Sequence, residues 1–247
     1  MHSFNVSLDY YNIRVANAVG ALSLTDIIPR CFNFDGQSNT TYSLNNVYCK
    51  QITRDPATGN IVFAREGLLN LAQYKTDGVD TQVDWSFGLG AVGLSDAAGK
   101  VHLNSMISYV HSFNVAALPG APSLNYAGSI GDTQVSPDMS HPRWKGYTSL
   151  GYGIGPVSAA LHWRYIGAMK DYSSVANPTS NAPGVGSYSY FDVDAHWAVI
   201  EHLNLTAGIT NLADKQPPFV SGQPLTTDAS TYDILGRTYF VGFTAKF

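Results

Sequence analysis

The sequence has little charge, little cysteine and no long apolar run. Lys, Arg, Asp and Glu make up 13% of the 247 residues, roughly half of the share that is usual in a soluble globular domain. The net charge is −4, and the basic residues form no cluster of the kind that nucleic-acid-binding proteins carry. We therefore expect no nucleic-acid partner.

Two membrane signals are also missing. The best candidate for a transmembrane helix, residues 146–163, lacks Asp, Glu, Lys and Arg but is interrupted by glycines and by Pro156, so we predict no membrane-spanning helix. Residues 1–5 have neither the basic nor the apolar region of a signal peptide. We expect the chain to be either cytosolic or one part of a longer protein.

What the sequence does contain is alternation. Apolar and polar residues alternate with a period of two in one segment after another, which is typical of β-strands that present two different faces. Tyr, Phe, Trp and Gly are plentiful as well. We predict an all-β, antiparallel fold of about eight strands, at residues 4–10, 79–87, 101–109, 143–154, 157–165, 191–199, 203–210 and 238–247.

The connections between these strands alternate in length. Residues 88–100, 154–157 and 200–203 are short links, whereas residues 15–68, 114–142, 168–187 and 213–235 are long and polar. Soluble domains rarely contain even one structureless loop beyond about 15 residues. Outer-membrane β-barrels have short periplasmic turns and long extracellular loops, and their strands cross the bilayer with about 9 to 11 residues. The pattern predicts part of a transmembrane β-barrel in a bacterial outer membrane.

In such a barrel the apolar face meets lipid and the polar face lines the lumen. We predict that the aromatic residues of the apolar register face outer-membrane lipid, namely Trp85, Tyr109, Trp163, Trp197 and Phe243. The opposite register carries ionisable side chains that should face the lumen, where solvation or pairing is their expected role: Asp80, Asp84, His162, Arg164, Asp192, Asp194 and His196.

Several motifs resemble those of TonB-dependent outer-membrane receptors, in the same order over almost the whole chain. Residues 208–215 (GITNLADK) and 236–247 (GRTYFVGFTAKF) resemble the end of these receptors, where an NLFDK element closes the penultimate strand and an aromatic residue ends the last one. Ala213 stands where Phe is usual. Residues 70–80 (NLAQYKTDGVD) and 6–13 (VSLDYYNI) are similar to two further strands of the family.

The resemblance implies a 22-stranded barrel, filled by an N-terminal plug, that takes up a scarce nutrient with energy from the TonB complex of the inner membrane. Residues 1–247 would be the C-terminal portion of that barrel, its last eight strands, with the plug and earlier strands absent. A piece with two unpaired edges is not expected to transport alone. The resemblance implies no enzymatic activity and no cofactor. It also assigns the signal read by the barrel-assembly machinery to Tyr239, Val241, Phe243 and Phe247.

The only cysteines, Cys31 and Cys49, both lie in the first long loop. We predict a disulfide between them, since an oxidising outer surface favours pairing; two free thiols are the alternative. Residues 54–59 (RDPATG) resemble a receptor subgroup that is linked to uptake of carbohydrates or complex siderophores. The ligand itself stays unknown.

Other chemistry has no support in the sequence. The seven histidines lack metal-ligand spacing, and no nucleophile elbow or phosphate-binding loop is present. Ligand contacts are expected instead from loop residues such as Tyr126, Tyr172 and Tyr232. Two other hypotheses stay open: a complete eight-stranded outer-membrane barrel with an adhesin or structural role, and a secreted β-sandwich that binds glycans.

Overall fold

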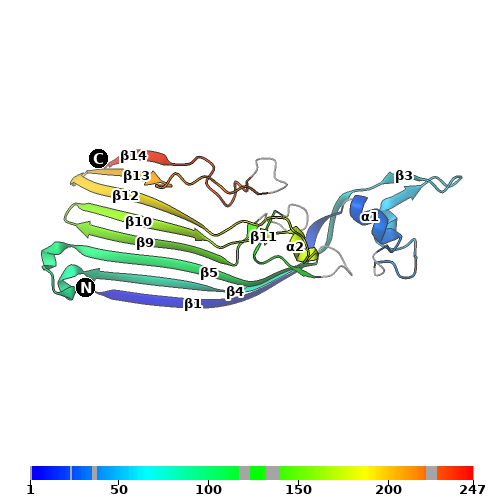
Figure 1. Cartoon of the computed structure of the whole chain (residues 1–247), viewed down its shortest axis with the longest axis horizontal. Helices are drawn as coiled ribbons and strands as arrows, with labels where there is room; N and C mark the ends of the chain where they lie inside the picture. Colours follow the sequence, from blue (N-terminus) through cyan, green and yellow to red (C-terminus); the bar gives the residue numbers. More distant parts are fainter. Residues whose placement is uncertain are drawn as a thin grey trace.

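The computed structural model describes residues 2–22, 24–34, 38–116, 123–131, 140–220 and 227–246. Its main feature is one antiparallel sheet in which eight long strands lie in chain order (Figure 1). These strands are β1 (Ser3–Leu22), β4 (Gly67–Gly88), β5 (Lys100–Ala116), β9 (Trp144–Ile154), β10 (Val157–Ile166), β12 (Tyr188–Ile200), β13 (Leu203–Thr210) and β14 (Thr238–Ala245). The predicted all-β, antiparallel fold is confirmed.

The sheet is open. Its strand order begins at β1 and ends at β14, and these two strands do not pair with each other in the part of the chain that the structure describes. In Figure 1 they lie at opposite margins of the sheet. The structure therefore gives no support to a complete, closed barrel of eight strands, because closure would require that pairing.

The first strands are longer than predicted. β1 has 20 residues, β4 has 22 and β5 has 17, so the prediction of a loop over residues 15–68 was wrong at both of its ends. A β-bulge explains the error. The pairing register shifts between Val15 and Ala18, and Asn17 has a φ of +57°, which breaks the alternation by which a strand is recognised.

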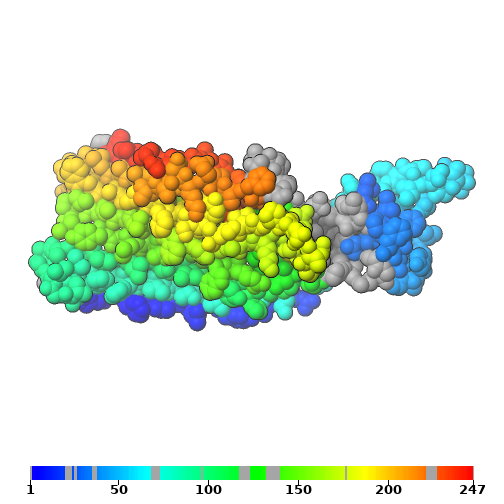
Figure 2. Space-filling view, viewed as in Figure 1, coloured from blue at the N-terminus to red at the C-terminus, as the bar shows by residue number. Residues whose placement is uncertain are grey.

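The hairpin of β1 and β4 carries a small folded tip, residues 24–34 and 38–66 as described. It contains α1 (Leu24–Cys31), a 3-10 turn (Cys49–Gln51) and the paired strands β2 (Ile52–Arg54) and β3 (Ile61–Ala64). Ile27, Cys31, Tyr48 and Cys49 form its buried core. In Figure 2 the tip projects beyond the end of the sheet.

The other long connections pack together at the same end of the sheet. They contribute β6 (Leu124–Asn125), which pairs with β5, the small sheet of β7 (Ser129–Ile130), β8 (Ser140–His141) and β11 (Lys170–Asp171), and α2 (Ser173–Ala176). One buried cluster, here called the loop core, joins them to β10 and β12 through Ile130, Ile166, Met169, Val185, Tyr190, Val220 and Tyr232. At the opposite end, the link between β4 and β5 holds two 3-10 turns (Leu89–Val92 and Asp96–Ala98).

Among the described residues, no helix is long and apolar enough to cross a membrane.

Candidate functional site

Strand pairing sorts the side chains of the sheet onto two chemically different faces. Directly opposed residues of antiparallel strands point to the same face. One row runs from β4 to β14 and is apolar throughout: Trp85, Leu103, Leu150, Leu161, Val193, Ile209 and Tyr239. The adjacent row on the other face consists of Asp84, Asn104, Ser149, His162 and Asp192. We call these the apolar face and the polar face.

The apolar face carries aromatic residues near both of its ends. The five aromatic residues predicted to meet lipid all lie on it, and Tyr109 packs on Trp144 with ring centroids 4.5 Å apart. On β12, Phe191 lies toward the long loops and Trp197 toward the short turns, with Val193 and Ala195 between them on the same face. Large side chains are left exposed here, for example Leu161 at 43% and Val241 at 83%. Two aromatic bands around an aliphatic zone are the arrangement of a membrane-facing barrel wall.

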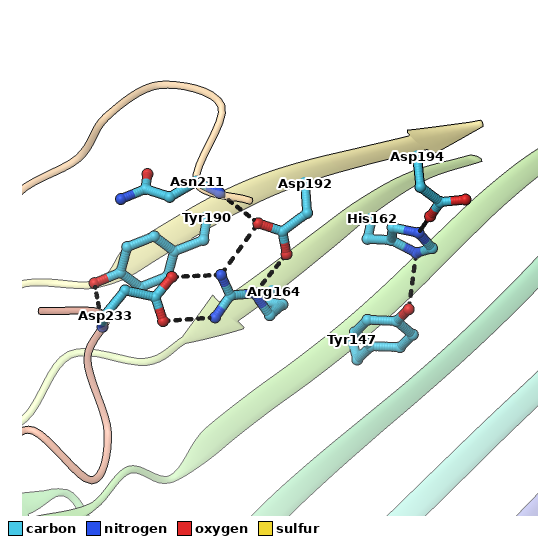
Figure 3. A network of polar contacts seen from close by, with 8 residues as sticks. All are labelled: Tyr147, His162, Arg164, Tyr190, Asp192, Asp194, Asn211 and Asp233. Carbon is cyan, nitrogen blue, oxygen red and sulfur yellow. Dashed lines mark hydrogen bonds and ion pairs between the residues drawn. The ribbon is translucent and has the colours of Figure 1, made fainter. Parts of the chain in front are cut away.

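The seven polar residues predicted to face the lumen all lie on the polar face, and Arg164 is at the centre of their main network (Figure 3). Its Nε donates to Asp192 Oδ2 at 2.7 Å, and its terminal nitrogens donate to both carboxylate oxygens of Asp233 at 2.9 and 2.5 Å. The guanidinium also lies 4.8 Å from the ring centroid of Tyr190. Arg164 is thus held by two carboxylates and one aromatic ring.

A second network links β9, β10, β12 and β13. The Nε2 atoms of His162 and His196 both face the carboxylate of Asp194. The Nδ1 atoms of the same rings lie 2.8 Å from the Tyr147 hydroxyl and 3.0 Å from the Thr206 hydroxyl. Because a carboxylate only accepts, Nε2 is the donor in both rings, and Nδ1 is left to the hydroxyl. Both ring nitrogens of His162 and of His196 therefore have a polar partner.

The other predicted polar residues lie closer to the β1 edge. Asp84 accepts a hydrogen bond of 2.7 Å from Asn104 and lies 3.6 Å from His102. Asp80 is exposed and lies opposite Asp9 of β1. Like charges in opposed positions are tolerated only where water solvates them, which agrees with a wet surface.

Sequence reasoning missed Asn211, Tyr190 and Asp233, which complete the Arg164 network. Asn211 is fully buried with a φ of +54°. Its backbone N–H donates to Asp192, while its side chain bonds the backbone of Lys215 in both directions. Asn tolerates this left-handed conformation, and its side chain can close a turn by bonding to the backbone a few residues further on. The NLADK segment was the available signal, and the structure gives it a physical role: it ends β13 and turns the chain back toward the polar face.

The structure overturns part of the expectation for the loop tyrosines. Tyr126 and Tyr232 are 5% and 2% exposed, whereas Tyr172 is 43% exposed. Burial raises the pKa of Tyr232, whose hydroxyl has no partner among the described residues. Tyr232 belongs to the loop core, so this tyrosine packs against other loop residues where a ligand contact had been predicted.

Asp228 is a second buried anchor of the same loop. Its carboxylate accepts hydrogen bonds from Ser140 and from the amide and hydroxyl of Ser230. Burial opposes ionisation, but these hydrogen bonds outweigh it and hold the pKa of Asp228 below its usual value. The loop between β13 and β14 is thereby tied to the loop between β5 and β9.

In the tip, Cys31 and Cys49 are joined by a disulfide with a Cα–Cα distance of 4.8 Å. The bond is buried with Tyr48 and Ile27, and Asn39 donates to the Cys31 carbonyl at 2.7 Å. The disulfide joins the last residue of α1 to the first residue of the 3-10 turn (Cys49–Gln51) within the tip.

A pocket of about 570 Å³ lies among the long loops. Arg143 and Lys170 line it together with Asn125, Ser129 and Ser174, and no carboxylate is among its described lining residues. We call it the rim pocket. A second hollow, on the polar face, lies over Gly151 and Gly153 and includes His162, Asp194 and His196. Within the described ranges, no group of three or more His, Cys, Asp and Glu side chains could hold a metal ion.

On β14, the residues assigned to barrel assembly lie on the apolar face and are largely exposed, Tyr239 at 69% and Phe243 at 75%. Val241 lies between them on that face. Phe247 lies outside the described residues.

Comparison with known proteins assigns this architecture. The family model described as "TonB dependent receptor-like, beta-barrel" matches residues 2–212. The fold is similar to that of the siderophore receptor PirA from Acinetobacter baumannii, with a TM-score of 0.53 and 15% identity. That likeness covers 99% of this chain and 30% of the PirA chain, so the sequence spans about a third of the receptor that it resembles. None of the curated proteins compared with it matches.

Proposed function

Because the chain belongs to the family of TonB-dependent receptor β-barrels, which are outer-membrane transport proteins and not enzymes, we propose that it forms one part of the wall of a receptor for a scarce nutrient. Transport by that receptor draws its energy from the TonB complex. The parent protein supplies the plug and about fourteen further strands, and residues 1–247 are the last eight strands of its 22-stranded barrel.

The observation that carries the proposal is the open sheet with two faces. A membrane-facing surface must be apolar with aromatic borders, and a lumen must be polar. The sheet has both over the same strands. Its free edges at β1 and β14 would leave backbone groups unpaired in lipid, which is prohibitive. The sheet is therefore complete only when both edges pair with other strands.

The rim pocket favours an anionic ligand. Arg143 and Lys170 line it and no carboxylate does among its described residues. Ferric siderophores that hold iron through catecholate or carboxylate groups carry net negative charge, so we propose a siderophore of this anionic kind as the ligand class. An uncharged carbohydrate is the alternative, supported by the RDPATG segment of the tip.

The test uses the full-length parent receptor in its outer membrane. We expect deletion of its gene to abolish uptake of the cognate radiolabelled ferric siderophore under iron limitation, and deletion of TonB to have the same effect. Reversing both charges of the rim pocket, Arg143→Glu with Lys170→Glu, should weaken uptake strongly. The control Lys50→Glu, which reverses one charge on the exposed surface of the tip, should leave uptake unchanged.

Two results would contradict the proposal at different levels. Loss of oligosaccharide uptake with normal siderophore uptake in the deletion strain would show that the ligand is a carbohydrate and not a siderophore. Normal uptake of both solutes in that strain would overturn the transport function itself.

A further inference from the structure

The connection between β13 and β14 does not extend away from the sheet but folds back over it. Its described residues 215–220 and 227–235 are here called the inner loop. Asp233 bonds to Arg164 of β10, and its backbone N–H lies 3.3 Å from the Tyr190 hydroxyl of β12. At the other side of the loop, the Tyr188 hydroxyl donates to the Gln216 carbonyl at 2.9 Å.

All of these wall residues lie on the polar face. Arg164 pairs with Tyr190 and Ile166 pairs with Tyr188, in the same register as His162 and Asp192. Lys215 adds a contact of 4.0 Å between its Nζ and the ring centroid of Tyr188. The inner loop thus crosses from β13 over β12 to β10 on the face that lines the lumen, close to the end where the long loops lie.

One ion pair is the strongest link between the inner loop and this wall. Asp233 receives two hydrogen bonds from a single guanidinium, a geometry that is stronger and more specific than a simple ion pair. Asp192 orients the same guanidinium from the wall side, so Arg164 is already in place when Asp233 binds. Tyr232, next to Asp233, is buried in the loop core.

We propose that the inner loop is a strap that lies along the lumen wall at its mouth, over β12 and β10, and that the Arg164–Asp233 pair is the latch that holds it against the wall. With the latch closed, residues 227–235 narrow the passage and shield the loop core from the external solution. This inference rests on the proposed barrel, because the polar face encloses a lumen only when the barrel is complete.

The test measures access to the strap in the assembled parent receptor on intact cells. Thr227 is 8% exposed, and its hydroxyl has no partner among the described residues, so Thr227→Cys is a mild change. Cys31 and Cys49 are bonded to each other and do not react. With the latch intact, we expect a membrane-impermeant maleimide to label Thr227→Cys slowly and a polymer-linked maleimide not to label it. The exposed Thr179→Cys should react with both.

Adding Asp233→Asn removes the ionic pair while keeping the size of the side chain. We expect labelling of Thr227→Cys to become at least about tenfold faster, since a charge-assisted bidentate contact is lost. Asp233→Glu, which keeps the charge, should restore slow labelling in part. Asp214→Asn makes the same charge change in the same connection, but its carboxylate bonds the Arg237 amide at 2.8 Å and not the wall; it should leave the rate unchanged.

Equal labelling rates of Thr227→Cys with and without the Asp233→Asn substitution would overturn the latch. Fast labelling of Thr227→Cys by the polymer reagent in the otherwise unchanged receptor would overturn the strap. Both readouts are independent of ligand uptake, so a receptor that assembles and labels as expected but carries no nutrient would refute the proposed function alone.

Discussion

Leu161 lies in the middle of β10 on the apolar face, and its neighbour Ala160 lies on the polar face. Leu161 is 43% exposed and pairs with Leu150 and Val193. Ala160 pairs with Gly151 and Asp194, which offer an empty position and a carboxylate. Placing Arg at each position therefore compares one charge in lipid with the same charge in the lumen.

The expected difference follows from these two surroundings. An Arg on the lipid face near the middle of the bilayer costs about 2 to 4 kcal/mol. At about 1.4 kcal/mol per factor of ten, Leu161→Arg should lower the folding equilibrium constant roughly 30- to 1,000-fold. Ala160→Arg places its charge in the polar lumen next to the Asp194 carboxylate and should change stability by less than about 1 kcal/mol.

The measurement is urea unfolding of the full-length parent in lipid vesicles, followed by the heat-modifiable mobility of the folded barrel. Equal destabilisation by the two substitutions would refute the reasoning, because it would mean that both faces meet the same medium. A larger loss for Ala160→Arg would show that the faces have been assigned the wrong way round.

Four further outcomes are expected. Reduction should raise the intact mass of the protein by two hydrogens as the bond between Cys31 and Cys49 opens, and it should destabilise the tip by about 3 kcal/mol; two thiols that alkylate in the native protein would disprove the pairing. Fluorescence of Trp163 in a receptor whose other tryptophans are Phe should be quenched by brominated lipid, and unchanged fluorescence would remove it from the lipid surface. Deleting Phe247 from the parent should reduce the heat-modifiable barrel in outer-membrane fractions by far more than roughly 1.5 to 3 kcal/mol of lost burial explains, so equal yields would leave it an ordinary packing residue. The folded-state pKa of Asp228 is lowered, so its carboxylate stabilises the loop at pH values above its unfolded pKa, about 4, and this stabilisation is lost as the pH falls through the folded-state pKa. Hydrogen exchange of residues 227–235, corrected for its intrinsic pH dependence, should therefore become faster in that acidic range in the wild type. Asp228→Asn should show no such increase.

The strands and their faces could be predicted because alternation is a local property. From Phe191 to Trp197, each residue's own polarity indicates the side to which it points, and the structure keeps that register. The extension of β1 past Val15 could not be predicted in the same way. The irregular pairing at residues 15–19 interrupts the alternation there, so the sequence of one long strand looks like a short strand followed by a loop.

The polar networks could be predicted only as far as the sheet reaches. Arg164 and Asp192 were assigned to one face, and they bond across neighbouring strands. Asp233 is separated from Arg164 by 69 positions and lies in a loop, where no periodicity links a residue to its partner. The burial of Tyr232 has the same origin, because the loop core exists only once three connections have met.

The length of the first hairpin sets how far the tip stands above the cell. The 20 residues of β1 measure about 66 Å at roughly 3.3 Å each, and crossing the bilayer takes about 10 of them. The remainder, inclined at roughly 40°, lifts the tip about 25 Å above the outer leaflet. At that height the exposed Phe34 and Tyr42 stand clear of the membrane surface, and the disulfide between Cys31 and Cys49 holds the tip in a fixed shape of its own, independent of the sheet.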